Sequence, residues 1–265
     1  MRSEAYKISG FTVVVAALGF MLRWLQNMRI LDEETGLASR APISGLVGGL
    51  IVLVALGLAG YVLYLHRYEA PTEAEQALEP HTPLFAVIAL VPAVLLIIAG
   101  MAQTVQRDIE VWPLLHRLNG VATMLVGLGA ALIATSVTNR EKGKTRRTGS
   151  ALMVVCACFW LVTAYRDAAT DPVVWRFVVE VIAGCLVLLA FHYMSGYFFC
   201  SPHPWMTLFT CNMGAVICIM CAIDDNSLAQ SLTYAATAMT LLIWGFVITE
   251  NLKTKPLHPT EKAEG

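Results

Sequence analysis

The sequence predicts an all-α polytopic membrane protein, a bundle of eight transmembrane helices arranged as four hairpins. Its 265 residues are 57% hydrophobic and only 14% charged. A hydrocarbon core about 30 Å thick needs about 20 apolar helical residues to cross it, and lipid forces every backbone polar group to bond within the protein. Eight apolar runs meet this length: spans about 8–28, 43–65, 83–102, 118–138, 148–165, 173–199, 204–223 and 227–249.

These spans leave little chain for anything else. The longest gap between them, 66–82, is a Glu- and Pro-containing loop, so we expect residues 1–265 to form a single transmembrane helical bundle domain. Any functional site then lies inside the bundle, at one of its two ends, or on a surface that binds a partner. The lipid bilayer is the expected environment, and a net charge of −1 gives no reason to expect a nucleic acid.

Seven cysteines and the motif content give no sign of a cofactor. Six of the cysteines fall within spans, where cysteine behaves as a small apolar residue. The sequence has no Gly-rich phosphate loop, no H-E-x-x-H and no G-x-S-x-G, which are the patterns of several nucleotide, metal and acyl-transfer sites. We therefore expect no cofactor, no metal and no assigned catalytic residue.

The orientation follows from loop 139–149, which reads NREKGKTRRTG and carries five cations. Short loops rich in Lys and Arg stay in the cytoplasm. With eight spans, both termini are then cytoplasmic as well. We expect a multi-pass protein of the plasma (inner) membrane.

The outer ends of the odd-numbered spans carry polar clusters. Arg107 and Asp108 follow the third span, Arg166 and Asp167 the fifth, and Asp225 the seventh. Helix capping and turn formation account for many of these acids. Clustered carboxylates also suit hard cations, so a divalent cation among Asp108, Asp167 and Asp225 is an open alternative.

Glu180 is the most informative single residue, because it stands about two turns inside the sixth span. Ionisable groups at such depth usually face the bundle interior or a water-filled cavity. Arg176 lies four residues earlier on the same helix face and offers a local ion pair. A pair with Arg23, about one turn inside the first span, is the alternative, and it would tie the first helix to the sixth.

Small residues and one proline predict how some helices pack. Gly45-x-x-x-Gly49 in the second span, and Gly127 and Gly129 in the fourth, would allow close approach of a neighbouring helix. Pro92 in the third span would kink that helix.

These observations favour a charged vestibule at the outer face that binds or passes a small polar or ionic solute. Arg23, Arg176 and Glu180 would line its floor. Its rim would be Arg107, Asp108, Arg166, Asp167 and Asp225. Two alternatives stay open: a non-catalytic partner or sensor subunit that docks another protein, and a membrane enzyme that uses paired carboxylates on a lipid or quinone.

Overall fold

The structure is a computed structural model, and it describes residues 2–29, 42–78, 83–106, 113–138, 143–170, 174–224 and 227–254. The long helices are α1 (Arg2–Arg29), α2 (Pro42–Leu65), α4 (Pro83–Val105), α5 (Pro113–Thr138), α6 (Gly143–Thr170), α7 (Val174–Phe198), α8 (Pro204–Cys221) and α9 (Leu228–Glu250). The short elements are β1 (Tyr68–Glu69), α3 (Ala74–Leu78) and β2 (Lys253–Thr254).

The predicted fold class is confirmed. Within the described ranges, eight helices are long and apolar enough to cross a membrane. They overlap the eight apolar runs, although α1 and α6 begin several residues earlier than those runs. The loop expected at 66–82 contains β1 and α3, which sequence patterning did not indicate. Pro92 lies inside α4, and the helix continues through it.

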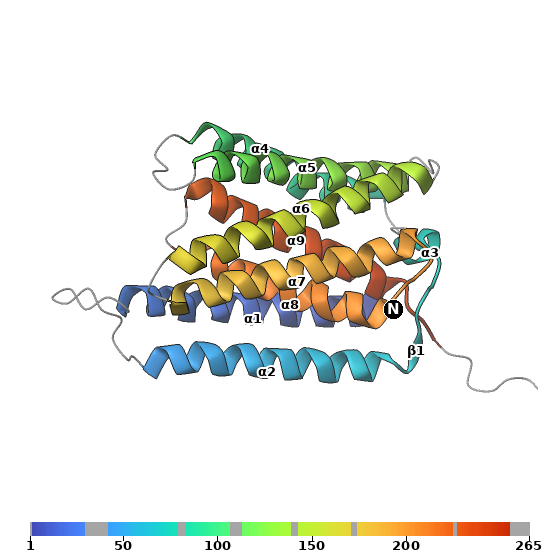
Figure 1. The fold of residues 1–265 in the computed structure, drawn as a ribbon. Helices are drawn as coiled ribbons and strands as arrows, with labels where there is room; N and C mark the ends of the chain where they lie inside the picture. The colour runs from blue at the N-terminus through green and yellow to red at the C-terminus, as the bar shows by residue number, and fades with distance from the viewer. Residues whose placement is uncertain are drawn as a thin grey trace, which may run out of the picture.

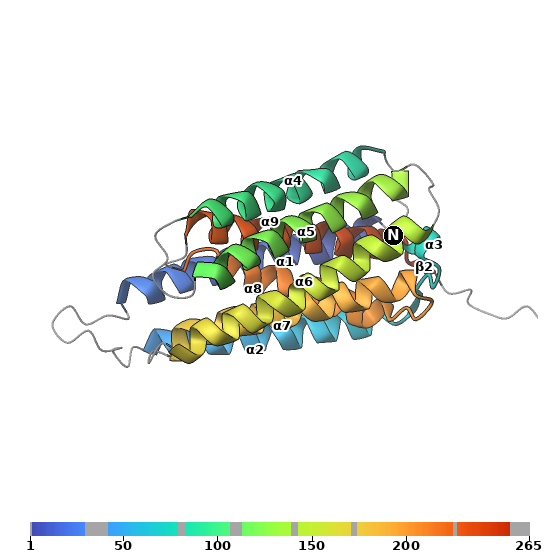
Figure 2. The ribbon, with the colours of Figure 1, turned by 45° about the horizontal axis from the view of Figure 1, so that its top comes forward.

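Six of the helices form a ring. Each helix from α4 to α9 contacts the next one along the chain, and α9 returns to contact α4. Helix α1 packs on α8 and α9, and α2 lies outside it against α1 and α8 (Figures 1 and 2). Helices α8 and α9 are the most buried of the spans and α2 the least. The hairpins predicted from the sequence are therefore present, and the ring closure is a feature that they did not reveal.

The helices alternate in direction, so the bundle has two distinct ends. We call the end that holds Arg2 and the β1–β2 pair the tail end (Figure 1). The opposite end, where α2, α5, α7 and α9 begin, is the turn end. The sequence predicts that the tail end is cytoplasmic.

Glycines set the close approach of three helices. A Cβ added at Gly100 in α4 would lie 2.5 Å from the carbonyl oxygen of Gly120 in α5. A Cβ at Gly129 in α5 would lie 2.7 Å from the carbonyl oxygen of Gly149 in α6. Gly127 packs against Ala93 of α4 in the same way, so the close approach predicted at Gly127 and Gly129 is present.

Gly45 and Gly49 of α2 do not make the close helix contact that the sequence predicts for them. A Cβ added at Gly45 or Gly49 would meet nothing within 4 Å. The close-approach face predicted for this span therefore does not contact the described part of the chain. Gly45 and Gly49 face away from the described part of the bundle, whereas a Cβ at Gly57 of the same helix would lie 3.8 Å from Phe11 Cζ of α1.

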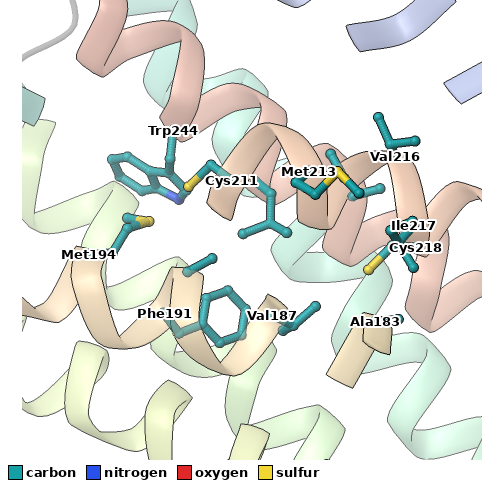
Figure 3. Close-up of a cluster of buried hydrophobic side chains, with 14 of the residues drawn as sticks. Ala183, Val187, Phe191, Met194, Cys211, Met213, Val216, Ile217, Cys218 and Trp244 are labelled. Atoms are coloured by element: carbon teal, nitrogen blue, oxygen red, sulfur yellow. The ribbon is translucent and has the colours of Figure 1, made fainter. Parts of the chain in front are cut away.

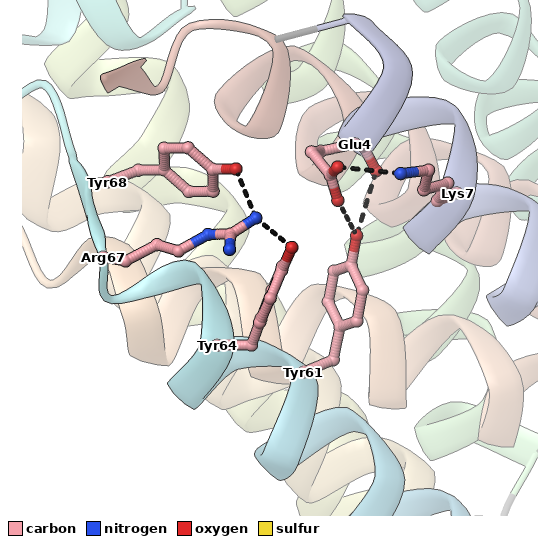
Figure 4. Close-up of polar contacts among 6 residues, drawn as sticks. All are labelled: Glu4, Lys7, Tyr61, Tyr64, Arg67 and Tyr68. Carbon is pink, nitrogen blue, oxygen red and sulfur yellow. Dashed lines mark hydrogen bonds and ion pairs between the residues drawn. The ribbon is translucent and has the colours of Figure 1, made fainter. Parts of the chain in front are cut away.

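Polar contacts fasten α1 to α2 at the tail end (Figure 4). The Glu4 carboxylate accepts hydrogen bonds from Lys7 Nζ at 2.9 Å and from Tyr61 Oη at 2.8 Å. The Arg67 guanidinium lies 3.6 Å from the centre of the Tyr64 ring. The Tyr61–Glu4 hydrogen bond therefore joins the first turn of α1 to the last turns of α2, whereas the Lys7 and Arg67 contacts lie within one segment each.

The C-terminal end of α9 is held by a second set of contacts. Arg2 Nε lies 2.7 Å from Glu250 Oε1, and Asn251 Nδ2 donates to the carbonyl oxygen of Ala77 at 2.9 Å. Strands β1 and β2 pair antiparallel, with Tyr68 opposite Thr254. The two ends of the described chain are thereby joined at one end of the bundle.

Part of the basic 139–149 segment is helical. Because α6 begins at Gly143, Arg146 and Arg147 lie in its first turns. Arg146 Nη2 donates to the carbonyl oxygen of Ser136 at 3.0 Å, and Arg147 Nε to that of Phe198 at 2.9 Å. These cations thus bond carbonyl groups at or near the C-terminal ends of α5 and α7, where the helix dipole favours positive charge.

Exchanging Gly100 for alanine tests the α4–α5 contact. The new methyl group must displace backbone, so we expect Gly100→Ala to lower the free energy of unfolding by about 1–3 kcal/mol. Thermal unfolding of the purified protein in detergent measures this. The matched control is Gly49→Ala, whose methyl group meets nothing and which should unfold no earlier than the wild type. Equal unfolding temperatures for Gly100→Ala and the wild type would rule out the close contact.

Candidate functional site

A cavity of about 250 Å³ lies among α4, α5, α6, α7 and α9. Its lining includes the partly exposed residues Gln106, His116 and Ser227, which belong to the end of α4 and to the starts of α5 and α9. The cavity therefore reaches the turn end of the bundle. Most of its polar lining is neutral amide and hydroxyl groups rather than charges.

Glu180 is the acidic residue in the described lining. Tyr234 Oη donates to Glu180 Oε1 at 2.5 Å, and Gln230 Nε2 donates to the same oxygen at 2.8 Å. An O–H···O⁻ bond this short is typical of a charge-assisted hydrogen bond. Gln230 and Tyr234 are four residues apart on α9 and so share one face of that helix. The carboxylate thus holds α7 against α9 and fixes one wall of the cavity.

Gln103 organises the opposite wall. Its Nε2 donates to Thr233 Oγ1 of α9 at 2.8 Å, and its Oε1 accepts from Thr123 Oγ1 of α5 at 3.4 Å. Trp160 Nε1 of α6 donates to Thr123 Oγ1 at 3.1 Å. Four helices therefore meet in one hydrogen-bonded network. A network of this kind fixes side-chain positions more firmly than isolated bonds do.

Thr237 carries a hydroxyl group with no partner. The residue is fully buried and lines the cavity, and its Oγ1 makes no hydrogen bond within the described structure. Leaving a buried hydroxyl unsatisfied costs about 1–3 kcal/mol. A molecule inside the cavity, either water or a solute, would remove that cost.

Apolar side chains pack beside the cavity. Val187 lines the cavity and also belongs to a buried cluster with Phe191 of α7, Cys211 of α8 and Trp244 of α9 (Figure 3). Phe191 follows Val187 by about one turn toward the tail end. The partly exposed lining residues lie at the turn end, and an apolar interface of α7, α8 and α9 adjoins the deeper part of the cavity.

Arg23 lies in a different contact from the one expected. It is 1% exposed, and its Nε and Nη2 donate to the two carboxylate oxygens of Asp224 at 2.7 and 3.1 Å. Its Nη1 donates to Gln26 at 2.8 Å. The side chain therefore joins α1 to the residues that follow α8, and it is not part of the described cavity lining.

The other predicted site residues fall into three groups. Arg166 is exposed at the end of α6 and does not line the cavity. Asp167 and Arg176 belong to α6 and α7, but their side chains lie outside the described part of the chain. Arg107, Asp108 and Asp225 lie outside the described residues altogether. The proposed cation site of Asp108, Asp167 and Asp225 therefore lies outside them too, and the side chains that are described contain no cluster of three metal-ligating residues.

Sequence reasoning identified Glu180 and missed its neighbours. Gln103, Asn119, Thr123 and Gln230 are uncharged polar residues in otherwise apolar spans. Such residues hydrogen-bond between helices in membranes. Each of them lies in the half of its helix nearer the turn end, and that shared placement was the signal available in the sequence.

Comparisons of the chain with protein-family models, curated proteins and solved structures found no match.

The Arg23–Asp224 pair gives a test of the contact between α1 and the residues that follow α8 at the turn end. Replacing one partner leaves a buried charge uncompensated, which costs about 3–5 kcal/mol. We expect Asp224→Leu to unfold well below the wild type, and the double variant Arg23→Met with Asp224→Leu to recover much of the loss. Thermal unfolding in detergent measures both. If the double variant were as unstable as the sum of the two single variants, the two residues would not be coupled.

Proposed function

We propose that this protein binds a small polar or ionic solute in the turn-end cavity and that binding is a step in its passage across the membrane. The observation that carries this proposal is a hydrogen-bonding cavity built around Glu180 between membrane-spanning helices. Ionisable groups in such helices mark solute or ion pathways because an exposed charge in lipid is costly.

The size and lining of the cavity support this proposal. A volume of about 250 Å³ has room for a small solute or several water molecules. Solute sites combine apolar walls with a few placed polar groups. Val187 and Trp160 supply apolar wall here, while Glu180, Asn119 and Thr237 supply polar groups.

The partly exposed lining at the turn end gives the direction of access. A solute would enter from the turn end and stop above Phe191 and Trp244. Passage to the tail end then requires the apolar layer between α7, α8 and α9 to part. Binding followed by such a rearrangement is the usual behaviour of transporters with a site near the middle of the membrane.

A partner or sensor subunit is the second candidate, and one observation favours it. The Gly45 and Gly49 positions of α2 contact nothing in the described chain, and glycine faces of this kind pack against other helices in membranes. A membrane enzyme has less support, because it needs two converging carboxyl groups and the described lining of the cavity supplies one, Glu180.

Exchanging Glu180 for glutamine tests the proposed site. The purified protein should be screened for thermal stabilisation by small amines, amino acids, polyols and organic acids. We expect at least one compound to raise the unfolding temperature, because a ligand that binds the folded state stabilises it. In Glu180→Gln this ligand-dependent rise should be lost or strongly reduced.

The matched control is Glu4→Gln, which changes a carboxylate that also accepts a tyrosine hydrogen bond but lies at the tail end. Glu4→Gln should show the same ligand-dependent rise in unfolding temperature as the wild type. A panel that stabilises neither the wild type nor the control would contradict the proposed function.

We also propose that the protein lies in the plasma membrane with its tail end in the cytoplasm. Cys200 is exposed between α7 and α8 at the tail end, so a membrane-impermeant maleimide should label it only after the cells are permeabilised. Leu228→Cys, at an exposed position of the turn end, should be labelled in intact cells. The reverse labelling pattern would show that the turn end, and not the tail end, faces the cytoplasm.

A further inference from the structure

We infer that the cavity takes a short organic ammonium ion that carries a hydroxyl group, with its ammonium beside Glu180 and its hydroxyl on Thr237. This inference rests on the proposed function and names the class of solute for the same cavity. Three features of the lining carry it: the charge near the mouth, the aromatic walls and the unsatisfied hydroxyl group.

The part of the cavity nearer the turn end suits an ammonium group. Glu180 supplies a carboxylate, held by Tyr234 and Gln230, and the rings of Tyr234 and Trp160 form part of the wall. Carboxylates and aromatic faces together are the usual surroundings of organic ammonium ions in proteins. The lining side chains that are described include no Lys or Arg, and His116 is their basic member.

Arg176 is the cation nearest in sequence on α7, one turn from Glu180 toward the turn end, and its side chain lies outside the described part. If the Arg176 side chain entered the cavity, its positive charge would favour an anionic solute over an ammonium ion. The choice of probes below separates these two cases.

Thr237 marks the deeper polar position. Three other threonines of α9 turn their hydroxyl groups back onto their own helix: Thr233, Thr240 and Thr249 donate to Ala229, Ala236 and Gly245. Thr237 does not make this bond, and its buried Oγ1 has no partner in the described structure. A hydroxyl group of the solute can both accept from Thr237 and donate to it.

The two positions lie at different depths. Thr237 follows Tyr234 by three residues, which is about 4.5 Å along the helix axis toward the tail end. The cavity of about 250 Å³ has room for a short solute with a few carbons between its amine and its hydroxyl group. Gly184 and Val187 line the cavity on the α7 side and offer the apolar surface for those carbons.

Calorimetric titration of the full-length protein in detergent tests the inference. The probes are ethanolamine and two compounds of similar size, neutral ethylene glycol and anionic glycolate. We expect ethanolamine to bind and the other two to bind at least tenfold more weakly. Thr237→Val should weaken ethanolamine binding by about tenfold, which is the loss of one hydrogen bond.

The matched control is Thr240→Val, since Thr240 is also buried on α9 but bonds Ala236 and does not line the cavity. It should bind ethanolamine as the wild type does. Tighter binding of glycolate or ethylene glycol would overturn the ammonium class and leave a solute site in place. An equal loss in the two threonine variants would overturn the Thr237 contact. If no probe binds and no compound in the wider screen stabilises the protein, this inference and the proposed function both fail.

Discussion

Hydrocarbon offers no hydrogen-bond partner, and this constraint shapes every polar contact in the bundle. Most of the described buried polar side chains find a partner on another helix or on their own backbone. Arg23 meets Asp224 across α1 and α8, and Thr12 hydrogen-bonds Asn212 at 2.9 Å across the same two helices. Glu180 meets Tyr234 across α7 and α9. These few pairs join segments far apart in the chain and select one arrangement of helices that are otherwise similarly apolar.

The number and approximate extent of the helices followed from the sequence because the length and composition of a membrane span are strong local signals. Their arrangement did not follow, because apolar faces match many neighbours equally well. The contact between α9 and α4 that closes the ring depends on pairs such as Gln103 and Thr233. These two residues are far apart in the chain, and no periodicity in the sequence indicates that they meet. Gly100 and Gly120 show the same limit, because the need for glycine at each position arises only from its close contact with the other helix.

Of the residues that line the candidate site in the described structure, only Glu180 was predicted from the sequence. A carboxylate inside a span is rare enough to mark Glu180 by itself, whereas amides and hydroxyl groups are common in membrane helices and carry little information singly. Arg23 was assigned to the same site because it lies at a similar depth, but depth does not fix the direction in which a side chain faces around the helix. Around Glu180 the ring of helices leaves an interior space, and there the Thr237 hydroxyl group lacks a partner in the described structure, unlike those of Thr233 and Thr240 on the same helix. That unmet hydrogen bond is the point at which we propose that the fold holds a bound molecule.

The central claim is that the turn-end cavity is open to water and small solutes, and cysteine accessibility measures this directly. In a variant with its seven native cysteines replaced, Thr237→Cys should react with a small water-soluble thiol reagent added from the turn side. Thr240→Cys, which lies outside the cavity lining, should stay unmodified under the same conditions. If both positions resist the reagent, or both react at the same rate, the cavity is not an accessible solute site.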